Sequence, residues 1–280
     1  MQSERPSRTA QRVAERRAAH QLMDRPLVLN DPLAVRIIGE RAAANLPEQP
    51  RNFVAARFRA FMAARSRFAE DELADAFARG TRQYVVLGAG LDTFAYRNPY
   101  TDLRVFEVDH PATQAWKKKR LAQTGIDIPA SMTFAPVDFD RETFDEGLRA
   151  AGFDETAPAF FSWLGVTMYL DPPIVLATLR AIVELNHANG VAFDYAMPRA
   201  SLGLVGKLAL DRLSRRVERA GEPFRGFFEP AALVKSMSEM GYSHVVDLGA
   251  DEINARYFAG RSDGLRVSGR VGRMLSARGS

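Results

Sequence analysis

Cysteine is absent from this chain of 280 residues, and its absence excludes disulfide bonds, zinc sites built on cysteine and a cysteine nucleophile. Long apolar runs are also lacking, because none approaches the roughly 20 residues that a membrane-spanning helix needs. The N-terminal segment has no apolar stretch after its charged residues, so it does not resemble a secretory signal. We therefore expect a cytoplasmic protein with no membrane partner.

The sequence also lacks internal repeats, low-complexity segments and a linker rich in proline and glycine, so we expect one compact unit. The formal net charge is only +4. Basic residues gather at 12–17, 117–120 and 212–219, in helical patterns that are typical of solvated helix faces. No zinc-finger spacing or aromatic–basic signature accompanies them, so neither a metal site nor a nucleic-acid partner is predicted. An anionic substrate is compatible with the charge.

Helical periodicity predicts that about 80 residues of helix precede the first strand. Within the stretch NDPLAVRIIG, Asp31 is expected to be the N-cap residue, with Pro32 at the first helical position. Ser7 can serve as the N-cap residue of the helix before it. We treat residues 1–80 as an N-terminal helical cap and residues 81–280 as the core that it covers. The predicted helices of the cap are 8–22, the stretch after Asp31, and 52–79.

Beyond residue 80, short apolar stretches alternate with helical patterns, which indicates a parallel sheet covered by helices on both faces. Such an α/β sheet binds ligands beyond the carboxyl ends of its strands. The predicted strands are 83–88, 103–109, 132–137, 158–164, 190–195, 243–248 and 265–275. The predicted helices among them are 111–124, 141–151, 172–188, 203–219, 229–240 and 251–259.

The stretch YVVLGAGLDTFAYR, residues 84–97, places two glycines and then an acid directly after the first predicted strand. Gly88 and Gly90 allow the backbone to turn sharply and a ligand to approach it closely. An ordinary strand-to-helix turn and a turn against a nucleotide-type cofactor are both compatible with this stretch alone.

Acids also follow the next two predicted strands. Asp109 ends the stretch LRVFEVD, 19 residues after Gly90, where an acid accepts hydrogen bonds from two ribose hydroxyls. Asp138 and Phe139 follow the third strand, where a carboxylate beside an aromatic ring can bind an adenine amino group and cover its ring. Each acid is alternatively the N-cap residue of the helix that follows it. Taken together with the Gly-x-Gly turn, the acids favour a cofactor site.

A nicotinamide cofactor normally accompanies Gly-x-Gly-x-x-Gly, but Thr93 stands at the third glycine position. S-adenosylmethionine suits the shorter motif better, because it has no pyrophosphate to place on a helix N-terminus. Its amino-acid end requires a partner for the carboxylate, ideally the fork of an arginine. A nicotinamide-dependent oxidoreductase is the alternative class of enzyme.

Several motifs in order resemble the leucine carboxyl methyltransferase-like family, and in particular its bacterial branch of S-adenosylmethionine-dependent methyltransferases. The resemblance implies a class I methyltransferase fold, which is Rossmann-like with seven mostly parallel strands, under an N-terminal helical cap. It also implies S-adenosylmethionine as the cofactor and a methyl acceptor as the partner. The motifs cover nearly the whole chain and are SRTAQRVAERRAAHQ with NDPLA, AARSRFAEDEL, QYVVLGAGLDTFAYR, VFEVDHPATQAWKKKRL, VDFD, FSWLGVTMYL and ARYFAGRSDGLRVSG.

Roles follow from this resemblance residue by residue. Arg65, in AARSR, matches the arginine that holds the methionine carboxylate of the cofactor. The other implied cofactor-binding residues are the turn glycines Gly88 and Gly90, the ribose-binding Asp109, and the adenine-side pair Asp138 and Phe139.

One position departs from the family pattern. The family often has Glu-Gly before its Met-Tyr-Leu segment, whereas WLGVTMYL has Leu164 in place of that glutamate. A polar contact to the cofactor or acceptor is therefore missing or is supplied elsewhere, which argues against methylation of a protein carboxyl terminus. We expect Leu164 to line the cofactor or acceptor site.

Methyl transfer has an excellent leaving group, so the protein mainly positions the reactants and excludes water. A carboxylate acceptor needs no general base, whereas a hydroxyl acceptor needs one near its oxygen. The catalytic candidates are Tyr169, which is alternatively packed core, and Arg199, which pairs an anionic acceptor or is a solvated loop charge. The sequence predicts O-methylation of a small-molecule carboxylate or hydroxyl. The second alternative, which Leu164 keeps open, is a protein that binds S-adenosylmethionine without transferring its methyl group.

Overall fold

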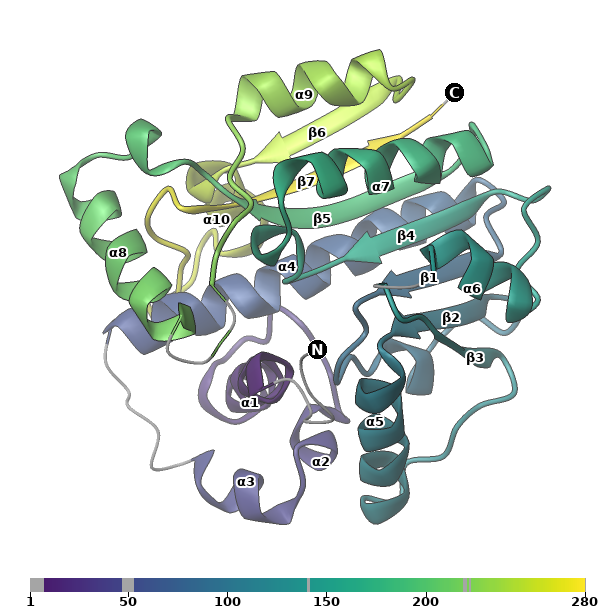
Figure 1. Ribbon diagram of the computed structural model, residues 1–280. Coiled ribbons are helices and arrows are strands. Elements are labelled where there is room, and N and C mark those ends of the chain that lie inside the picture. The colour runs from purple at the N-terminus through teal and green to yellow at the C-terminus, as the bar shows by residue number, and fades with distance from the viewer. Residues whose placement is uncertain (1–7, 47–52, 140–141, 219–220, 222, 280) are drawn as a thin grey trace.

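The computed structural model describes residues 8–46, 53–139, 142–218, 221 and 223–279, and its centre is a seven-stranded sheet (Figure 1). The strand order is β3-β2-β1-β4-β5-β7-β6. All pairs are parallel except those of β7, which runs antiparallel to β5 and β6. The strands are β1 Gln83–Leu87, β2 Arg104–Asp109, β3 Met132–Pro136, β4 Ala159–Trp163, β5 Gly190–Ala196, β6 His244–Leu248 and β7 Gly272–Arg278. The predicted α/β architecture is confirmed.

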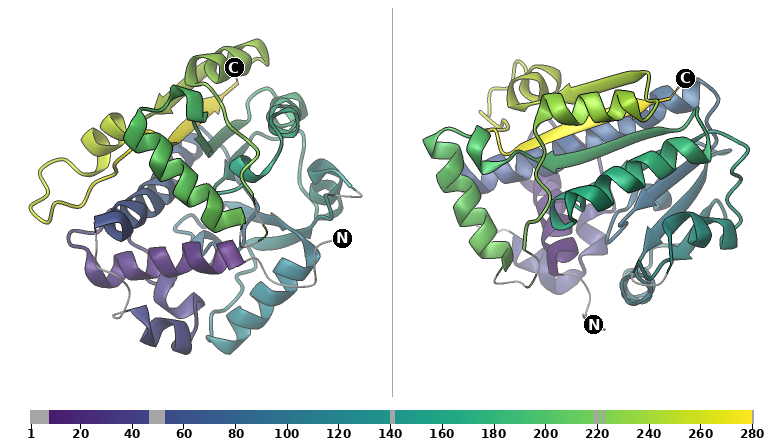
Figure 2. Two further views of the ribbon diagram at one scale, coloured as in Figure 1. Left: turned by 60° about the vertical axis from the view of Figure 1, so that its left-hand side comes forward. Right: turned by 45° about the horizontal axis from the view of Figure 1, so that its top comes forward.

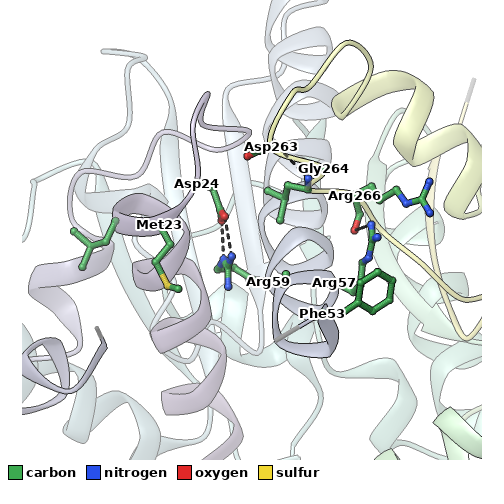
Figure 3. Close-up of a pocket in the computed structure, with 11 residues that line it drawn as sticks. Met23, Asp24, Phe53, Arg57, Arg59, Asp263, Gly264 and Arg266 are labelled. Carbon is green, nitrogen blue, oxygen red and sulfur yellow. Dashed lines mark hydrogen bonds and ion pairs between the residues drawn. The ribbon is translucent and has the colours of Figure 1, made fainter. Parts of the chain in front are cut away.

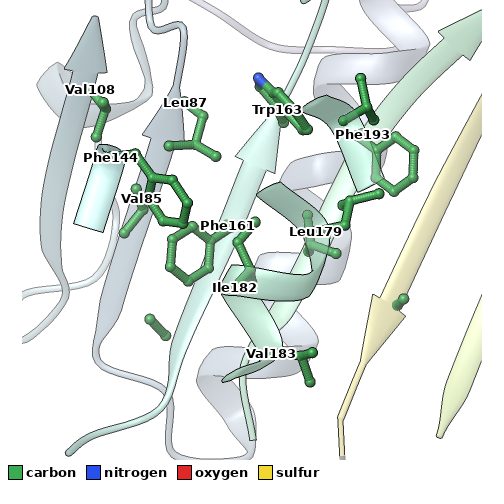
Figure 4. Close-up of a cluster of buried hydrophobic side chains, with 14 of the residues drawn as sticks. Val85, Leu87, Val108, Phe144, Phe161, Trp163, Leu179, Ile182, Val183 and Phe193 are labelled. Carbon is green, nitrogen blue, oxygen red and sulfur yellow. The ribbon is translucent and has the colours of Figure 1, made fainter. Parts of the chain in front are cut away.

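Both faces of the sheet are buried because successive side chains of a strand point to opposite sides. In β1, Val85 and Leu87 enter one apolar cluster, whereas Tyr84 and Val86 enter another. Figure 4 shows the first cluster, in which β1, β2, β4 and β5 meet α7 (Pro172–Leu185) and the side chain of Phe144. The strands therefore read as continuous apolar runs, as expected for a sheet covered on both sides.

The helices follow the predicted order closely, and α4 is the longest of them with 26 residues. In Figures 1 and 2, α6, α7 and α9 cover one face of the sheet, and α4 crosses the other face. None of the described helices is long and apolar enough to cross a membrane. The remaining bounds are α1 Arg8–Met23, α2 Ala34–Ile37, α3 Glu40–Ala44, α4 Phe53–Ala78, α5 Pro111–Gln123, α6 Phe144–Ala150, α8 Leu204–Glu218, α9 Pro230–Glu239 and α10 Ala250–Tyr257, with short 3-10 turns η2 Phe94–Tyr96, η3 Thr167–Tyr169 and η4 Arg199–Ser201.

The final strand starts later than its sequence pattern predicts, at Gly272 rather than at residue 265. Leu265 and Val267 are buried, and their alternation with polar residues resembles a strand. The backbone of Val267 is instead paired by a side chain, because Asn254 donates to its carbonyl and accepts from its N–H. A loop can therefore bury this apolar pair without a β-ladder.

The short helix after Asn30 also starts later than predicted, at Ala34. Asp31 is therefore not the N-cap residue of this helix, which is Leu33. Asp31 is fully buried and takes part in contacts described below. Ser7, the predicted N-cap residue of the first helix, lies outside the described residues.

Candidate active site

The chain reverses direction across the sheet between β1 and β4. From β1 it adds β2 and β3 on one side, and from β4 it adds β5 on the other. In an open α/β sheet this reversal opens a crevice at the carboxyl ends of the two central strands. The predicted site residues at the strand ends lie along this edge, and α8 stands beyond the same edge in both figures of the whole chain (Figures 1 and 2).

The Gly-x-Gly turn directly follows β1. Gly88 and Gly90 have φ angles of 67° and 47°, in the left-handed region that favours glycine. A Cβ atom on Gly88 would lie 2.6 Å from a methyl group of Val166, which follows β4. The two central strand ends therefore approach each other closely, and only glycine fits between them.

Asp109 holds this turn from the end of β2. Its Oδ2 accepts the Gly90 N–H at 2.7 Å, and its Oδ1 accepts the His110 N–H at 2.7 Å. Burial raises the pKa of Asp109, and the two backbone N–H groups offset part of that effect. Asp109 is not the N-cap residue of α5, because His110 occupies that position. The Thr113 side chain is a third hydrogen-bond partner. A carboxylate has about four lone-pair positions, so Asp109 can still accept a further hydrogen bond.

Asp138 and Phe139 follow β3, the outer neighbour of β2. Asp138 is half-buried, and Phe139 has 57% of its surface exposed. The helix after them starts at Phe144 with Thr143 as its N-cap residue, so Asp138 does not cap it. Neither acid is therefore explained as the N-cap residue of the following helix.

Arg65 reaches the site from α4 and is 5% exposed. Its Nη1 donates to Oδ2 of Asp194 at 3.0 Å. The second carboxylate oxygen of Asp194 accepts the Gly165 N–H at 2.5 Å. Asp194 lies on β5 and is fully buried. The sequence predictions did not include it, because one acid within an apolar strand gives no sign of a partner in a distant helix.

The three remaining candidates lie around the ends of β4 and β5. Leu164 is half-buried and packs against the apolar cluster between the sheet and α4. Tyr169 is half-buried, and its ring lies 5.3 Å from that of Phe224. Arg199 is 59% exposed and pairs with Asp211 of α8 through two hydrogen bonds of 2.8 and 3.1 Å. In this arrangement Arg199 faces a carboxylate of the protein itself.

The second half of the LGAGLDTFAYR motif contacts the N-terminal helices. Arg17 of α1 donates to Asp92 at 3.0 Å and to the carbonyl of Leu91 at 2.6 Å. The hydroxyl of Thr93 donates to Asp31 at 2.7 Å. Arg97 pairs with Asp31 and with Glu70 of α4. These contacts bind the turn after β1 to the predicted helical cap.

Two of the predicted solvated basic clusters contain buried members. Arg17 is 5% exposed and Lys117 is 1% exposed, which corrects the prediction for these positions. Lys117 lies 2.6 Å from Glu107 of β2. Burial raises the pKa of Glu107 to about 7, although Lys117 favours its ionised form. Lys117 shares a buried helix face with Leu121, four residues later, and this spacing was an available signal.

A separate pocket of about 480 Å³ lies between the end of α1, the start of α4 and residues 263–266 (Figure 3). Asp24 and Arg59 line it and form an ion pair with distances of 2.6 and 2.8 Å. Its lining includes none of the predicted cofactor-binding residues. We therefore do not assign the cofactor to this pocket.

The residues at the crevice fit S-adenosylmethionine on two grounds. The glycine turn is not one of them, because Cβ atoms on Gly88 and Gly90 would meet Val166 and Ala10 of the chain itself. Asp109 provides a carboxylate with free acceptor capacity. Nε of Arg65 is buried and has no hydrogen-bond partner among the described residues, and an unpaired buried donor favours an incoming acceptor.

The fold is that of the class I methyltransferases. The chain superimposes on the crystal structure of magnesium protoporphyrin IX methyltransferase from Synechocystis with a TM-score of 0.51 and 14% identity, over 88% of this chain and 91% of that chain. A family model described as leucine carboxyl methyltransferase matches residues 10–183. The chain therefore belongs to the leucine carboxyl methyltransferase family, and it is an S-adenosylmethionine-dependent methyltransferase. The predicted family, fold, enzyme class and cofactor are confirmed.

Two relatives illustrate this membership. The Bacillus subtilis protein YktD, named as an S-adenosyl-L-methionine-dependent methyltransferase, is 30% identical over 89% of this chain and 90% of its own length. A Mycobacterium marinum protein with the same type of name is 36% identical over 67% of this chain and 64% of its own length. The first of these matches covers most of both chains.

Proposed function

We propose that this methyltransferase acts on a carboxylate or hydroxyl oxygen of a small, largely apolar acceptor. The observation that carries the cofactor part of the proposal is the contact between Asp109 and the Gly90 N–H at 2.7 Å, at the point where the strand order reverses. Asp109 would bind the ribose hydroxyls and Arg65 the methionine carboxylate. Asp138 and Phe139 would bind the adenine.

The acceptor part of the proposal rests on the apolar surroundings of the β5 end. Met197, Leu202 and Leu210 form a small cluster there, joined by Phe224 and Phe227. The loop that carries these phenylalanines is pressed onto η3. Its Arg225 and Gly226 N–H groups donate to the carbonyl of Met168, and a Cβ on Gly226 would lie 2.4 Å from the carbonyl of Thr167. An aromatic or aliphatic acceptor matches such walls.

Methyl transfer requires little of the side chains beyond orienting the two reactants and excluding water. When bound, S-adenosylmethionine would supply a methyl group activated by its positively charged sulfur, and the residues of the crevice would orient it toward the acceptor oxygen. For a hydroxyl acceptor, Tyr169 is the proposed site of proton transfer. For a carboxylate acceptor, Arg199 would exchange its ion pair with Asp211 for one with the acceptor.

The predicted division into a helical cap, residues 1–80, and a core, residues 81–280, remains a prediction. We propose that the cap selects the acceptor. The contacts of Arg17 and Asp31 with the turn after β1 support this role, because they place α1 and the segment between α1 and α2 beside that turn. Ala10 of α1 would lie 3.1 Å from a Cβ atom on Gly90.

Calorimetric titration with S-adenosylhomocysteine tests the role of Arg65. Lysine cannot reproduce the fork of an arginine on a carboxylate, so Arg65→Lys should weaken binding by about 10-fold or more. The matched control is Arg67→Lys on the same helix, because Arg67 is half-exposed and pairs with Asp71 on the surface. Equal affinities in wild type and Arg65→Lys would remove Arg65 from the site.

The acceptor class is tested with labelled S-adenosylmethionine and a panel of aromatic and aliphatic acids, phenols and alcohols. We expect labelled methyl esters or ethers of apolar members. With a carboxylic acid acceptor, Tyr169→Phe should leave the turnover number near the wild-type value, whereas with a phenol it should lower it. Transfer only to peptides, nucleic acids or strongly polar metabolites would refute the proposed acceptor class.

A further inference from the structure

The ion pair between Arg65 and Asp194 joins residues that are 129 positions apart. The side chains of Arg65 and Asp194 are 6% and 1% exposed. A buried ion pair is weak evidence for a stabilising role, because the loss of hydration of both charges offsets their attraction. Such a pair is better explained by what it orients, and the neighbours of Asp194 indicate what that is.

Asp194 has one crevice contact on each carboxylate oxygen. Oδ2 accepts from the Arg65 guanidinium, and Oδ1 accepts from the Gly165 N–H. Its own carbonyl accepts the Thr167 hydroxyl at 2.6 Å. Gly165 and Thr167 both belong to the segment that follows β4. One carboxylate therefore fixes a side chain from α4 and the backbone after β4 relative to each other.

The turn at Gly165 brings this backbone directly against the guanidinium. Gly165 has a φ angle of 74°, and a Cβ atom on it would lie 2.8 Å from Nη1 and 2.9 Å from Nη2 of Arg65. The two terminal nitrogens of Arg65 thus lie against the end of β4. The strand register puts Trp163 beside Phe193, so Leu164, the first residue after β4, is the neighbour along the chain of Trp163 as Asp194 of β5 is of Phe193.

We infer that Asp194 is a positioning residue that holds the guanidinium of Arg65 in the orientation that receives the methionine carboxylate of the cofactor. This inference rests on the proposed role of Arg65. With one terminal nitrogen held by Asp194, the guanidinium cannot rotate away from the β4 end, and its remaining N–H groups keep a fixed direction. Buried Nε is one such group without a partner among the described residues.

The affinities for two ligands distinguish a positioning role of Asp194 from a general role in stabilising the fold. S-adenosylhomocysteine carries the amino-acid carboxylate, whereas 5′-methylthioadenosine has the same adenosine and sulfur but lacks that carboxylate. Asp194→Asn keeps the size of the side chain and an oxygen for the Gly165 N–H, but it removes the charge that faces Arg65. We expect a loss of about 10- to 100-fold in affinity for S-adenosylhomocysteine, with a change below about 2-fold for methylthioadenosine.

Asp247→Asn is the matched control. Asp247 of β6, the edge strand of the same sheet, pairs with Arg273 of β7 at 3.0 Å and accepts from the Tyr195 hydroxyl at 3.0 Å. Successive side chains of a strand point to opposite faces, so Tyr195 lies on the other face of β5 from Asp194, and the loss of Asp247 should leave both affinities unchanged. Equal losses of both ligands in Asp194→Asn, or no loss of either, would overturn the inference. Wild-type protein that binds neither ligand would instead refute the proposed cofactor site, and an unaffected Arg65→Lys would refute the role of Arg65.

A second variant covers the case in which Asp194→Asn does not fold. Gly165→Ala leaves Asp194 intact but places a methyl group where the guanidinium now lies. It should show the same selective loss of S-adenosylhomocysteine binding. Retention of wild-type affinity for that ligand in Gly165→Ala would show that the position of the guanidinium is irrelevant, and the inference would be wrong.

Discussion

Arg17→Met should lower the free energy of unfolding. The size of the effect should depend on how deeply the Arg17–Asp92 ion pair is buried rather than on the distance between its charged groups. Arg17 is 5% exposed and Asp92 is 21% exposed, with 3.0 Å between their charged groups. Burial opposes ionisation of Asp92, but Arg17 and Lys117 overcome that effect and hold its pKa below the ordinary value. Removing Arg17 therefore leaves a largely buried carboxylate without its main partner.

The expected cost follows from this geometry. Breaking a fully buried pair costs roughly 3–5 kcal/mol, and the partial exposure of Asp92 reduces that figure. Loss of the 2.6 Å hydrogen bond to the Leu91 carbonyl adds about 1 kcal/mol. We expect the free energy of unfolding to fall by about 3 kcal/mol.

Urea unfolding followed by circular dichroism measures this change. The control is Arg149→Met, because Arg149 makes shorter ion pairs of 2.6 and 2.7 Å but is half-exposed. The urea concentration at the midpoint of unfolding should therefore be the same in this variant as in the wild type. The double variant Arg17→Met/Asp92→Leu should recover part of the loss, since it removes both charges. Equal, small shifts for Arg17→Met and Arg149→Met would refute the reasoning.

Three further outcomes are expected. Asp109→Ala should weaken S-adenosylhomocysteine binding in calorimetry by about 10- to 100-fold, and an unchanged affinity in the folded variant would limit Asp109 to holding the turn. Leu164→Glu should lower the free energy of unfolding by about 1–3 kcal/mol, because Leu164 packs against an apolar cluster, whereas Leu164→Met should change it little; a wild-type value for the glutamate variant would contradict this. The raised pKa of Glu107, about 7 against its ordinary 4.5, means that the folded chain keeps a proton that the unfolded chain releases between these values. The contribution of Glu107 to stability therefore falls as pH rises through that window. Urea unfolding at several pH values should show a flatter dependence of the free energy of unfolding on pH in Glu107→Leu/Lys117→Met. An unchanged dependence would assign it to other titratable groups.

The order of the elements was predictable because each strand is short, apolar and set off by polar turns. The strand predicted at 83–88 is observed as Gln83–Leu87, and the one predicted at 190–195 is observed as Gly190–Ala196. These strands are buried on both faces, so hydrophobicity alone marks them. The segment 265–271 has a similar alternation, but within it the backbone of Val267 is paired by the side chain of Asn254. Local patterns do not reveal such a tertiary substitute for a β-ladder.

The contacts within the site were less accessible than its residues. Arg65 and Asp109 could be selected from their positions in motifs, but the partner of Arg65 is 129 positions away. Asp194 lies in a strand that reads simply as apolar core. The sequence predicts that the polar contact at Leu164 is either missing or supplied from elsewhere. Asp194 is a candidate for supplying it, because its carboxylate comes from the neighbouring strand and accepts the N–H of Gly165.

Thr93 bears both on the choice of cofactor and on the packing of the chain. At the sequence level it argues against a nicotinamide cofactor, because it replaces the third glycine of the dinucleotide motif. In the structure its side chain is fully buried, and its hydroxyl donates to Asp31 at 2.7 Å. A glycine there would leave Asp31, itself fully buried, without this donor, at a cost of about 1–3 kcal/mol. The residue that departs from the dinucleotide motif is thus one of several, with Asp92 and Arg97, that join the turn to the N-terminal part of the chain. The motif LGAGLDTFAYR therefore resembles a shortened dinucleotide-binding motif and also contacts the N-terminal helices.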